Sequence, residues 1–171
     1  MKSLLAAIMC CVGMGCGAAS NGSLGVIPGQ SRADAEGSLE RSNYCRGGAA
    51  THKIQKYGRC GVTGFENVES WVVVNYGKTG KVVRARRLER FGSHRAAVKG
   101  WNLRWENKRD ELGTSSSEAR AQLSVLGETP EGAITWKVWF SASGSHLIGL
   151  YLVKPSDLSD AQVVEVIRAR P

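Results

Sequence analysis

The chain has 171 residues, of which 42% are hydrophobic and 22% charged, and its formal net charge at pH 7 is +8. This length suits one domain with a tail, and the composition is that of a globular protein without long acidic or Gln/Asn-rich tracts. The positive surplus favours anionic partners.

The N-terminus has the pattern of an export signal. Lys2 precedes an apolar run over residues 4–14, and small residues follow that run. The run is too short to span a bilayer, which requires ~20 apolar residues. We therefore expect residues 1–19 to be a signal peptide and the protein to be exported.

Two processing sites remain open. Gly15-Cys16 resembles the lipobox of bacterial lipoproteins, and this resemblance implies acylation of Cys16 as the new N-terminus. Gly13 and Met14 depart from the family's pattern, which usually has an aliphatic and a small residue at these positions. Ordinary cleavage after Ala19 would instead release a soluble periplasmic or secreted protein.

Residues 20–43 are poor in aromatic residues and rich in Gly, Ser, Ala and charge. Such segments bury little apolar surface and behave as flexible tethers. We therefore expect a tether over residues 20–43 that holds a single folded domain, residues 44–171, away from a membrane.

Two cysteines remain in the expected mature domain, Cys45 and Cys60. In an exported chain such a pair is expected to be oxidised, and closing a loop of this length stabilises by ~3 kcal/mol in the chain-entropy model. The spacing is not that of a redox CxxC motif, and zinc would need two further ligands where only His52 is near. We expect a disulfide and no metal or other cofactor.

Two hairpins are predicted. Residues 70–76 and 81–90 read as strands around a Gly-flanked turn, whose GKT triplet is not a phosphate-binding loop because a strand follows it. The segment 133–154 alternates apolar and polar residues around Ser143-Gly144. With those two residues as the loop, Phe140 pairs with Leu147, Val138 with Gly149 and Trp136 with Tyr151.

Helix signals flank residues 94–112, with Ser93 as N-cap and Gly113 just past the end. Residues 120–128 alternate Ala121, Leu123 and Val125 and predict a strand. The final residues predict a short helix, because Ser159 and Gln162 form a capping-box pattern.

Together these elements predict an α+β domain. Its antiparallel sheet would have about five strands in the order β-β-α-β-β-β-α, with both helices packed on one face.

Positive charge is concentrated between Lys81 and Arg109. This stretch holds ten Lys or Arg and two Glu, a surplus of eight that equals the net charge of the whole chain. Clustered cations attract anionic partners. The candidate binding residues are Arg84, Arg86, Arg87, Arg90, Arg95 and Lys99.

No catalytic motif is present, and the three histidines, His52, His94 and His146, stand in no recognisable arrangement. The sequence therefore favours a non-catalytic envelope lipoprotein that binds an anionic envelope component or another protein through residues 81–109. Nucleic acid is a further anionic candidate. A small periplasmic hydrolase-like enzyme and a structural subunit of an envelope complex are the alternatives.

Overall fold

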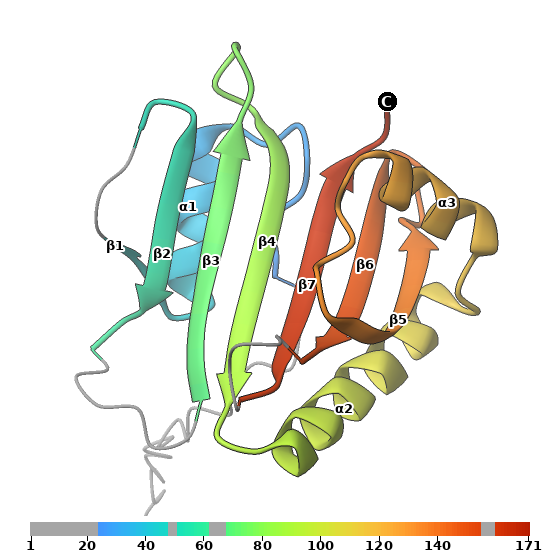
Figure 1. The fold of residues 1–171 in the computed structure, drawn as a ribbon. Coiled ribbons are helices and arrows are strands. Elements are labelled where there is room, and N and C mark those ends of the chain that lie inside the picture. Colours follow the sequence, from blue (N-terminus) through green and yellow to red (C-terminus); the bar gives the residue numbers. More distant parts are fainter. Residues whose placement is uncertain (1–23, 48–50, 62–67, 155–159) are drawn as a thin grey trace, which may run out of the picture.

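The structure is a computed structural model that describes residues 24–47, 51–61, 68–154 and 160–171. Its seven strands form one antiparallel sheet in the order β1-β2-β3-β4-β7-β6-β5 (Figure 1). The last strand is therefore inserted between the two hairpins. The strands are β1 (Tyr44–Gly47), β2 (Ile54–Arg59), β3 (Val68–Tyr76), β4 (Val82–Phe91), β5 (Ala133–Phe140), β6 (His146–Val153) and β7 (Gln162–Ala169).

Each of the three helices begins at a serine. The helices are α1 (Arg32–Arg41), α2 (His94–Leu112) and α3 (Ser117–Val125). The hydroxyls of Ser31, Ser93 and Ser116 each accept a hydrogen bond from the backbone N–H three residues later. These caps satisfy amide donors that have no partner within a helix.

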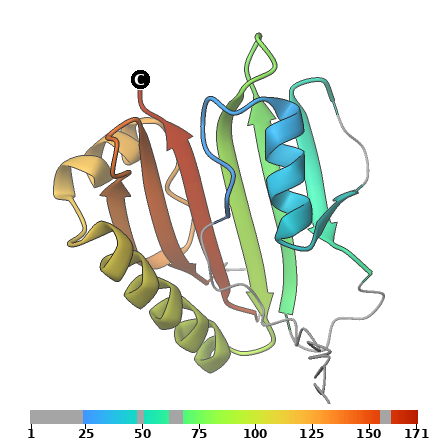
Figure 2. The same cartoon turned by 180° about the vertical axis from the view of Figure 1, so that it is seen from behind.

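The helices divide between the two faces of the sheet (Figures 1 and 2). α1 packs over β1–β4 and α2 over β5–β7 on one side, which we call the two-helix face. α3 packs on the opposite side, the one-helix face, over β5, β6 and β7. Because side chains alternate along a strand, Arg87 and Glu165 lie on the two-helix face, while Arg86 and Val166 lie on the one-helix face.

Three buried clusters form the core, one beneath each helix. The largest buried side chains include Tyr57 under α1, Trp139 under α2 and Tyr151 under α3. A Cβ on Gly149 would lie 2.6 Å from a methyl carbon of Leu123, so any larger residue there would force the side chains between α3 and β6 to shift. Each helix therefore covers about half of one face of the sheet.

Several predicted elements are confirmed. The second hairpin has the predicted register, with Phe140 opposite Leu147, Val138 opposite Gly149 and Trp136 opposite Tyr151. α2 spans the predicted residues with its predicted cap. The first hairpin is β3–β4, and the turn after Tyr76 leads into a strand rather than a phosphate-binding helix. A disulfide joins Cys45 to Cys60, as expected.

The predicted sheet of five strands with two helices is wrong, since the sheet has seven strands and three helices pack on it. Residues 117–125 form α3 rather than a strand. Ser116 caps this helix, and its buried positions are Ala119 and Leu123, four residues apart. Val125, the third residue of the apparent alternation, is 88% exposed.

The C-terminal helix is also wrong, because Gln162–Ala169 form β7. Ser159 of the expected capping box lies outside the described residues, while Gln162 begins the strand. Residues 163–167 are all buried, since helices cover β7 on both faces. A run of this length that is apolar apart from Glu165 suits a central strand as well as a helix, and only neighbouring strands decide between them.

The N-terminal part of the domain also differs from the expectation. The segment for which we expected a tether contains α1, and Leu24, Val26 and Leu39 are buried in the core. The disulfide-closed segment contributes two strands, β1 and β2. Residues 1–19, including Cys16, lie outside the described residues. Within the described part of the chain, no helix is long and apolar enough to span a membrane.

Candidate binding surface

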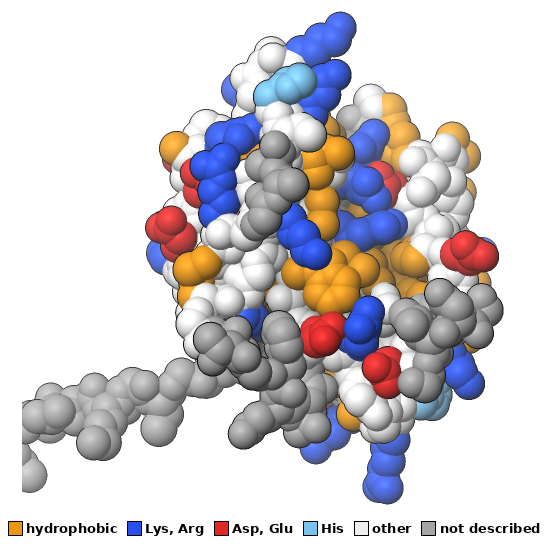
Figure 3. All heavy atoms as spheres, turned by 60° about the vertical axis from the view of Figure 1, so that its left-hand side comes forward, with side chains coloured by type: hydrophobic (Ala, Val, Ile, Leu, Met, Phe, Trp, Pro, Cys, Tyr) orange, Lys and Arg blue, Asp and Glu red, His pale blue; other side chains and the backbone are white. Residues whose placement is uncertain are grey.

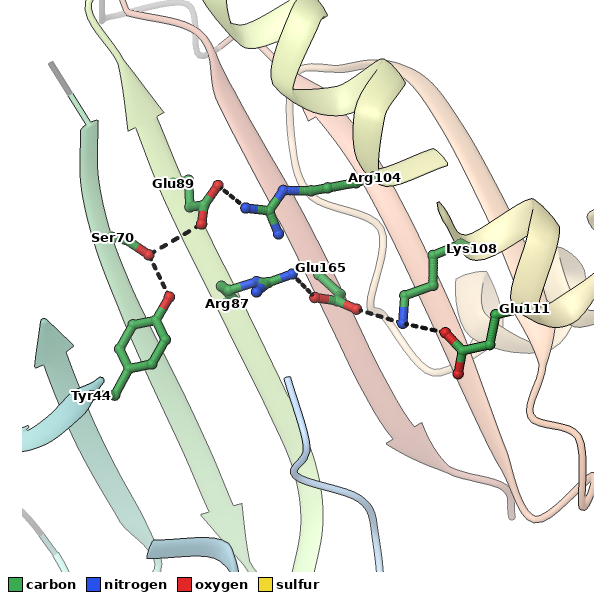
Figure 4. Close-up of polar contacts among 8 residues, drawn as sticks. All are labelled: Tyr44, Ser70, Arg87, Glu89, Arg104, Lys108, Glu111 and Glu165. Atoms are coloured by element: carbon green, nitrogen blue, oxygen red, sulfur yellow. Dashed lines mark hydrogen bonds and ion pairs between the residues drawn. The ribbon is translucent and has the colours of Figure 1, made fainter. Parts of the chain in front are cut away.

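Two groups of charged side chains occupy opposite faces of the sheet. The first is a buried network on the two-helix face (Figure 4). Arg87 of β4 and Glu165 of β7 are register partners and form an ion pair. Lys108 of α2 reaches down to Glu165, with 3.3 Å between its Nζ and Oε1, and also lies 3.7 Å from Glu111. The network therefore fixes α2 to the two central strands.

A second branch of the network runs toward β1. Arg104 of α2 forms an ion pair with Glu89 of β4. The same carboxylate lies 3.4 Å from the hydroxyl of Ser70, which in turn is 2.6 Å from the hydroxyl of Tyr44 (Figure 4). These contacts cross from α2 over β4 and β3 to the strand at the far edge.

Three cations surround the central carboxylate of the network, Glu165. Burial by itself would raise the pKa of Glu165, but the nearby charges of Arg87, Lys108 and Arg104 outweigh it and lower that pKa to about 2. Burial lowers the pKa of Arg104, and the charge of Arg87 adds to the effect. A carboxylate whose pKa lies near 2 is a weak general base at neutral pH, because a catalytic pKa works best near the operating pH. The ion pairs of Glu165 and Glu89 with Lys108 and Arg104 position α2 on the sheet.

The three histidines do not assemble with this network into a catalytic group. His52 and His94 are exposed, while His146 is buried at the start of β6, where burial and the charge of Lys108 lower its pKa. β2 and β6 are four strand spacings apart, about 19 Å at ~4.8 Å per strand. Among the described residues, no group of three or more His, Cys, Asp or Glu could hold a metal ion.

The second group lies on the one-helix face, over β2, β3 and β4. No described helix covers this part of the sheet, which we call the open quadrant. Figure 3 shows Lys and Arg side chains gathered around an apolar centre on this side of the molecule. The register places the following residues on it: Lys56, Trp71, Val73, Arg84, Arg86, Leu88 and Arg90.

Trp71 is the centre of the open quadrant, and two cations lie over its ring. Lys56 Nζ is 5.3 Å and Arg90 Cζ 5.9 Å from the ring centroid. These two positive groups therefore lie no more than 11.2 Å apart. Glu69 pairs with Arg90 at 3.1 Å. The indole ring of Trp71 thus holds the positive charges of Lys56 and Arg90 close together, with Glu69 as the one carboxylate paired with them among the described residues.

The arginines at the β7 side of the quadrant share one further carboxylate. Glu128, which follows α3, lies 2.7 Å from Arg84 and 3.6 Å from Arg168. Arg86, two residues along β4 from Arg84, makes no ion pair within the described part of the chain, and its buried Nε has no hydrogen-bond acceptor. Burial lowers the pKa of Arg86, and the charge of Arg84 lowers it further. The charge of Glu128 acts in the opposite direction, so Arg84, Arg86 and Arg168 share the influence of this one carboxylate.

The structure brings together only part of the predicted basic surface. Arg84, Arg86 and Arg90 share the open quadrant. Arg87 does not belong to it, because it faces the other way and is 4% exposed in its pair with Glu165. The remaining two predicted residues, Arg95 and Lys99, are exposed on α2, on the opposite side of the sheet.

Sequence reasoning missed Lys56 and Trp71, since their membership depends on how β2 and β3 pair. It also missed the acidic members of the buried network. A signal was present in both strands: Arg87 and Glu89 share one side of β4, and Glu165 interrupts a run of valines. An isolated acid in an apolar strand indicates a buried partner.

Comparisons with known proteins found no match for the chain among the family models, the curated proteins or the solved structures.

Proposed function

We propose that the protein is a non-catalytic binding module whose open quadrant holds an anionic partner. The observation that supports this proposal is the surplus of positive charge on a part of the sheet that no described helix covers. Four cations stand in the quadrant and a fifth, Arg168, lies beside it on β7, with two carboxylates, Glu69 and Glu128, a surplus of three. The cations are Lys56, Arg84, Arg86, Arg90 and Arg168.

The chemistry of these cations suits an anionic ligand. A half-buried guanidinium without an acceptor loses hydration and gains nothing in return. A carboxylate or phosphate supplied by a partner would restore those hydrogen bonds, and Arg binds such groups in a bidentate manner. Arg84 and Arg90 already pair with Glu128 and Glu69, whereas Lys56 and Arg86 have no ion pair among the described residues and remain available to a partner.

The cell envelope is the proposed location. The signal-like pattern of residues 1–19 supports export, and a lipid on Cys16 would anchor the domain to a membrane surface. Both features lie outside the described residues, so the proposal that concerns the open quadrant does not depend on them.

The test compares two variants that lose equal charge. In one, Lys56, Arg86 and Arg90 are changed to Gln; in the control, Lys78, Arg95 and Lys99 are changed to Gln, all of which are exposed outside the quadrant. The measurement is the salt concentration that elutes each protein from immobilised heparin, a general polyanion.

We expect the quadrant variant to elute at clearly lower salt than the control, because site-specific contacts add to the effect of net charge. Equal shifts for the two variants would show that only net charge matters and would contradict the proposal.

A further inference from the structure

The arrangement of the helices says more about the partner of the open quadrant. Each face of the sheet can be divided into a half over β1–β4 and a half over β5–β7. α1 covers the first half and α2 the second half of the two-helix face, and α3 covers the second half of the one-helix face. The open quadrant is the fourth of these areas. An antiparallel sheet can leave part of a face in water, so the side chains of the quadrant indicate whether a further layer fits there.

The open quadrant has the pattern that a helix would cover. Trp71 and Val73 form an apolar line along β3, and both are half-buried rather than exposed. Lys56 stands on β2 at one side of this line, and Arg84, Arg86 and Arg90 stand on β4 at the other. β2 and β4 are two strand spacings apart, about 9.6 Å, close to the ~10–12 Å diameter of a helix with its side chains.

We propose that the open quadrant binds an acidic amphipathic helix from a partner protein, lying along β3. This inference rests on the proposed function and specifies its partner. Apolar side chains at positions i, i+3, i+4 and i+7 of the helix would pack on Trp71 and Val73. Asp or Glu on both flanks of that stripe would pair with Lys56 on one side and with Arg86 on the other.

The same contacts argue against other anionic occupants. A single-stranded nucleic acid is held by bases stacked on free aromatic faces, whereas the ring of Trp71 already carries Lys56 and Arg90. A flat bilayer would first meet α3, which stands on the same face of the sheet beside the quadrant (Figure 1). A helix is narrow enough to lie beside α3.

A designed peptide tests the geometry directly. The probe is a labelled peptide of about five turns, roughly 18 residues, with a Leu stripe flanked by Glu. A control peptide has the same composition in an order that destroys the stripe, and a second control has Lys in place of Glu. We expect the acidic amphipathic peptide to bind the full-length protein at least about tenfold more tightly than either control.

Reversing the charge of Arg86 then tests whether the peptide binds at the open quadrant. Arg86→Glu should weaken the acidic peptide about tenfold or more and strengthen the Lys peptide, whereas Lys99→Glu on α2 should leave the preference unchanged. The reversal of preference distinguishes a direct contact from a folding defect, which would weaken both peptides. Equal binding of ordered and shuffled peptides, or no change with Arg86→Glu, would overturn the inference.

The native partner is tested in cells by a photo-cross-linking amino acid at Val73, with Lys99 as the matched control position. We expect a product specific to Val73 whose cross-linked segment has an apolar stripe with acidic flanks. Cross-links to lipid, to nucleic acid, to a second copy of this chain, or to a segment without that pattern would overturn the inference, as would no product specific to Val73.

The two proposals fail in different ways. If the quadrant variant loses heparin retention but no peptide or cross-link shows a helix, the quadrant binds anions and only the helix is wrong. If the quadrant and control variants leave heparin at the same salt, the proposed function itself fails.

Discussion

Arg86 and Arg87 are neighbours on one strand, yet their surroundings have almost nothing in common. Arg87 faces α2, is buried and pairs with Glu165. Arg86 faces the open quadrant and has no ion pair among the described residues. The alternation of β4 places one guanidinium in a buried network of ion pairs and the other on the opposite face, without an ion pair among the described residues. The number of charged residues in a strand therefore does not predict a binding surface until each residue is assigned to a face of the sheet.

The largest effect on stability is expected from removing the central acid of the buried network, Glu165. Glu165→Gln would leave Arg87 and Lys108 buried without their shared counter-charge. We expect the free energy of unfolding to fall by about 3–5 kcal/mol, measured by urea denaturation. The control is Glu111→Gln, since that side chain is half-exposed and its pair with Lys108 is worth less than about 1 kcal/mol. Similar losses in the two variants would contradict a dominant role for Glu165.

The pH dependence of stability provides a second test of the role of Glu165. The pKa of Glu165 is lowered in the folded protein from 4.5 to about 2, so its contribution is fully present above pH 4.5 and is lost as the pH falls toward 2. The loss across this window is about 3 kcal/mol for a shift of this size. Urea denaturation at several pH values checks it. The Glu165→Gln protein should show a correspondingly flatter profile, and an unchanged profile would contradict the assignment.

Substitution of two glycines on the one-helix face tests the difference in packing between the area under α3 and the open quadrant. Gly149→Ala would place a methyl group against Leu123 and Tyr151 and should destabilise by about 1–3 kcal/mol. Gly58→Ala, next to Trp71, meets no atom within 4 Å and should change stability by less than about 0.5 kcal/mol. Thermal denaturation of both variants is the measurement. A large loss for Gly58→Ala would mean that something already covers the open quadrant.

The smallest expected effect is that of Arg86→Gln on the unliganded protein. The substitution removes the cost of burying this charge and its repulsion by Arg84. The free energy of unfolding should therefore stay within about 0.5 kcal/mol of the original or rise slightly. Retention on heparin should nevertheless fall. Arg87→Gln is the matched neighbour, and we expect it to destabilise by several kcal/mol. A strong loss of stability for Arg86→Gln would show that the residue serves the fold rather than a partner.

Local patterns predicted the elements whose signals lie within a few residues. The β5–β6 register followed from a turn and an alternation, and α2 followed from a serine cap and a terminal glycine. The disulfide followed from two cysteines in a chain with an export signal. The binding surface was found only in part, because three of its cations lie on β4 while Lys56 and Trp71 come from strands whose pairing no local signal reveals.

The sequence by itself determined the two hairpins, the long helix, the cysteine pair and the concentration of charge between Lys81 and Arg109. Tertiary structure alone decided the rest. Residues 162–169 became a strand because β4 and β6 offer hydrogen-bonding edges on both sides of them, and residues 117–125 became a helix because they cover that strand and its neighbours. The same insertion of β7 set Glu165 beside Arg87 and left Arg86 facing the uncovered side. Pairing between distant segments, rather than local preference, therefore divided the basic residues between the core and the open quadrant.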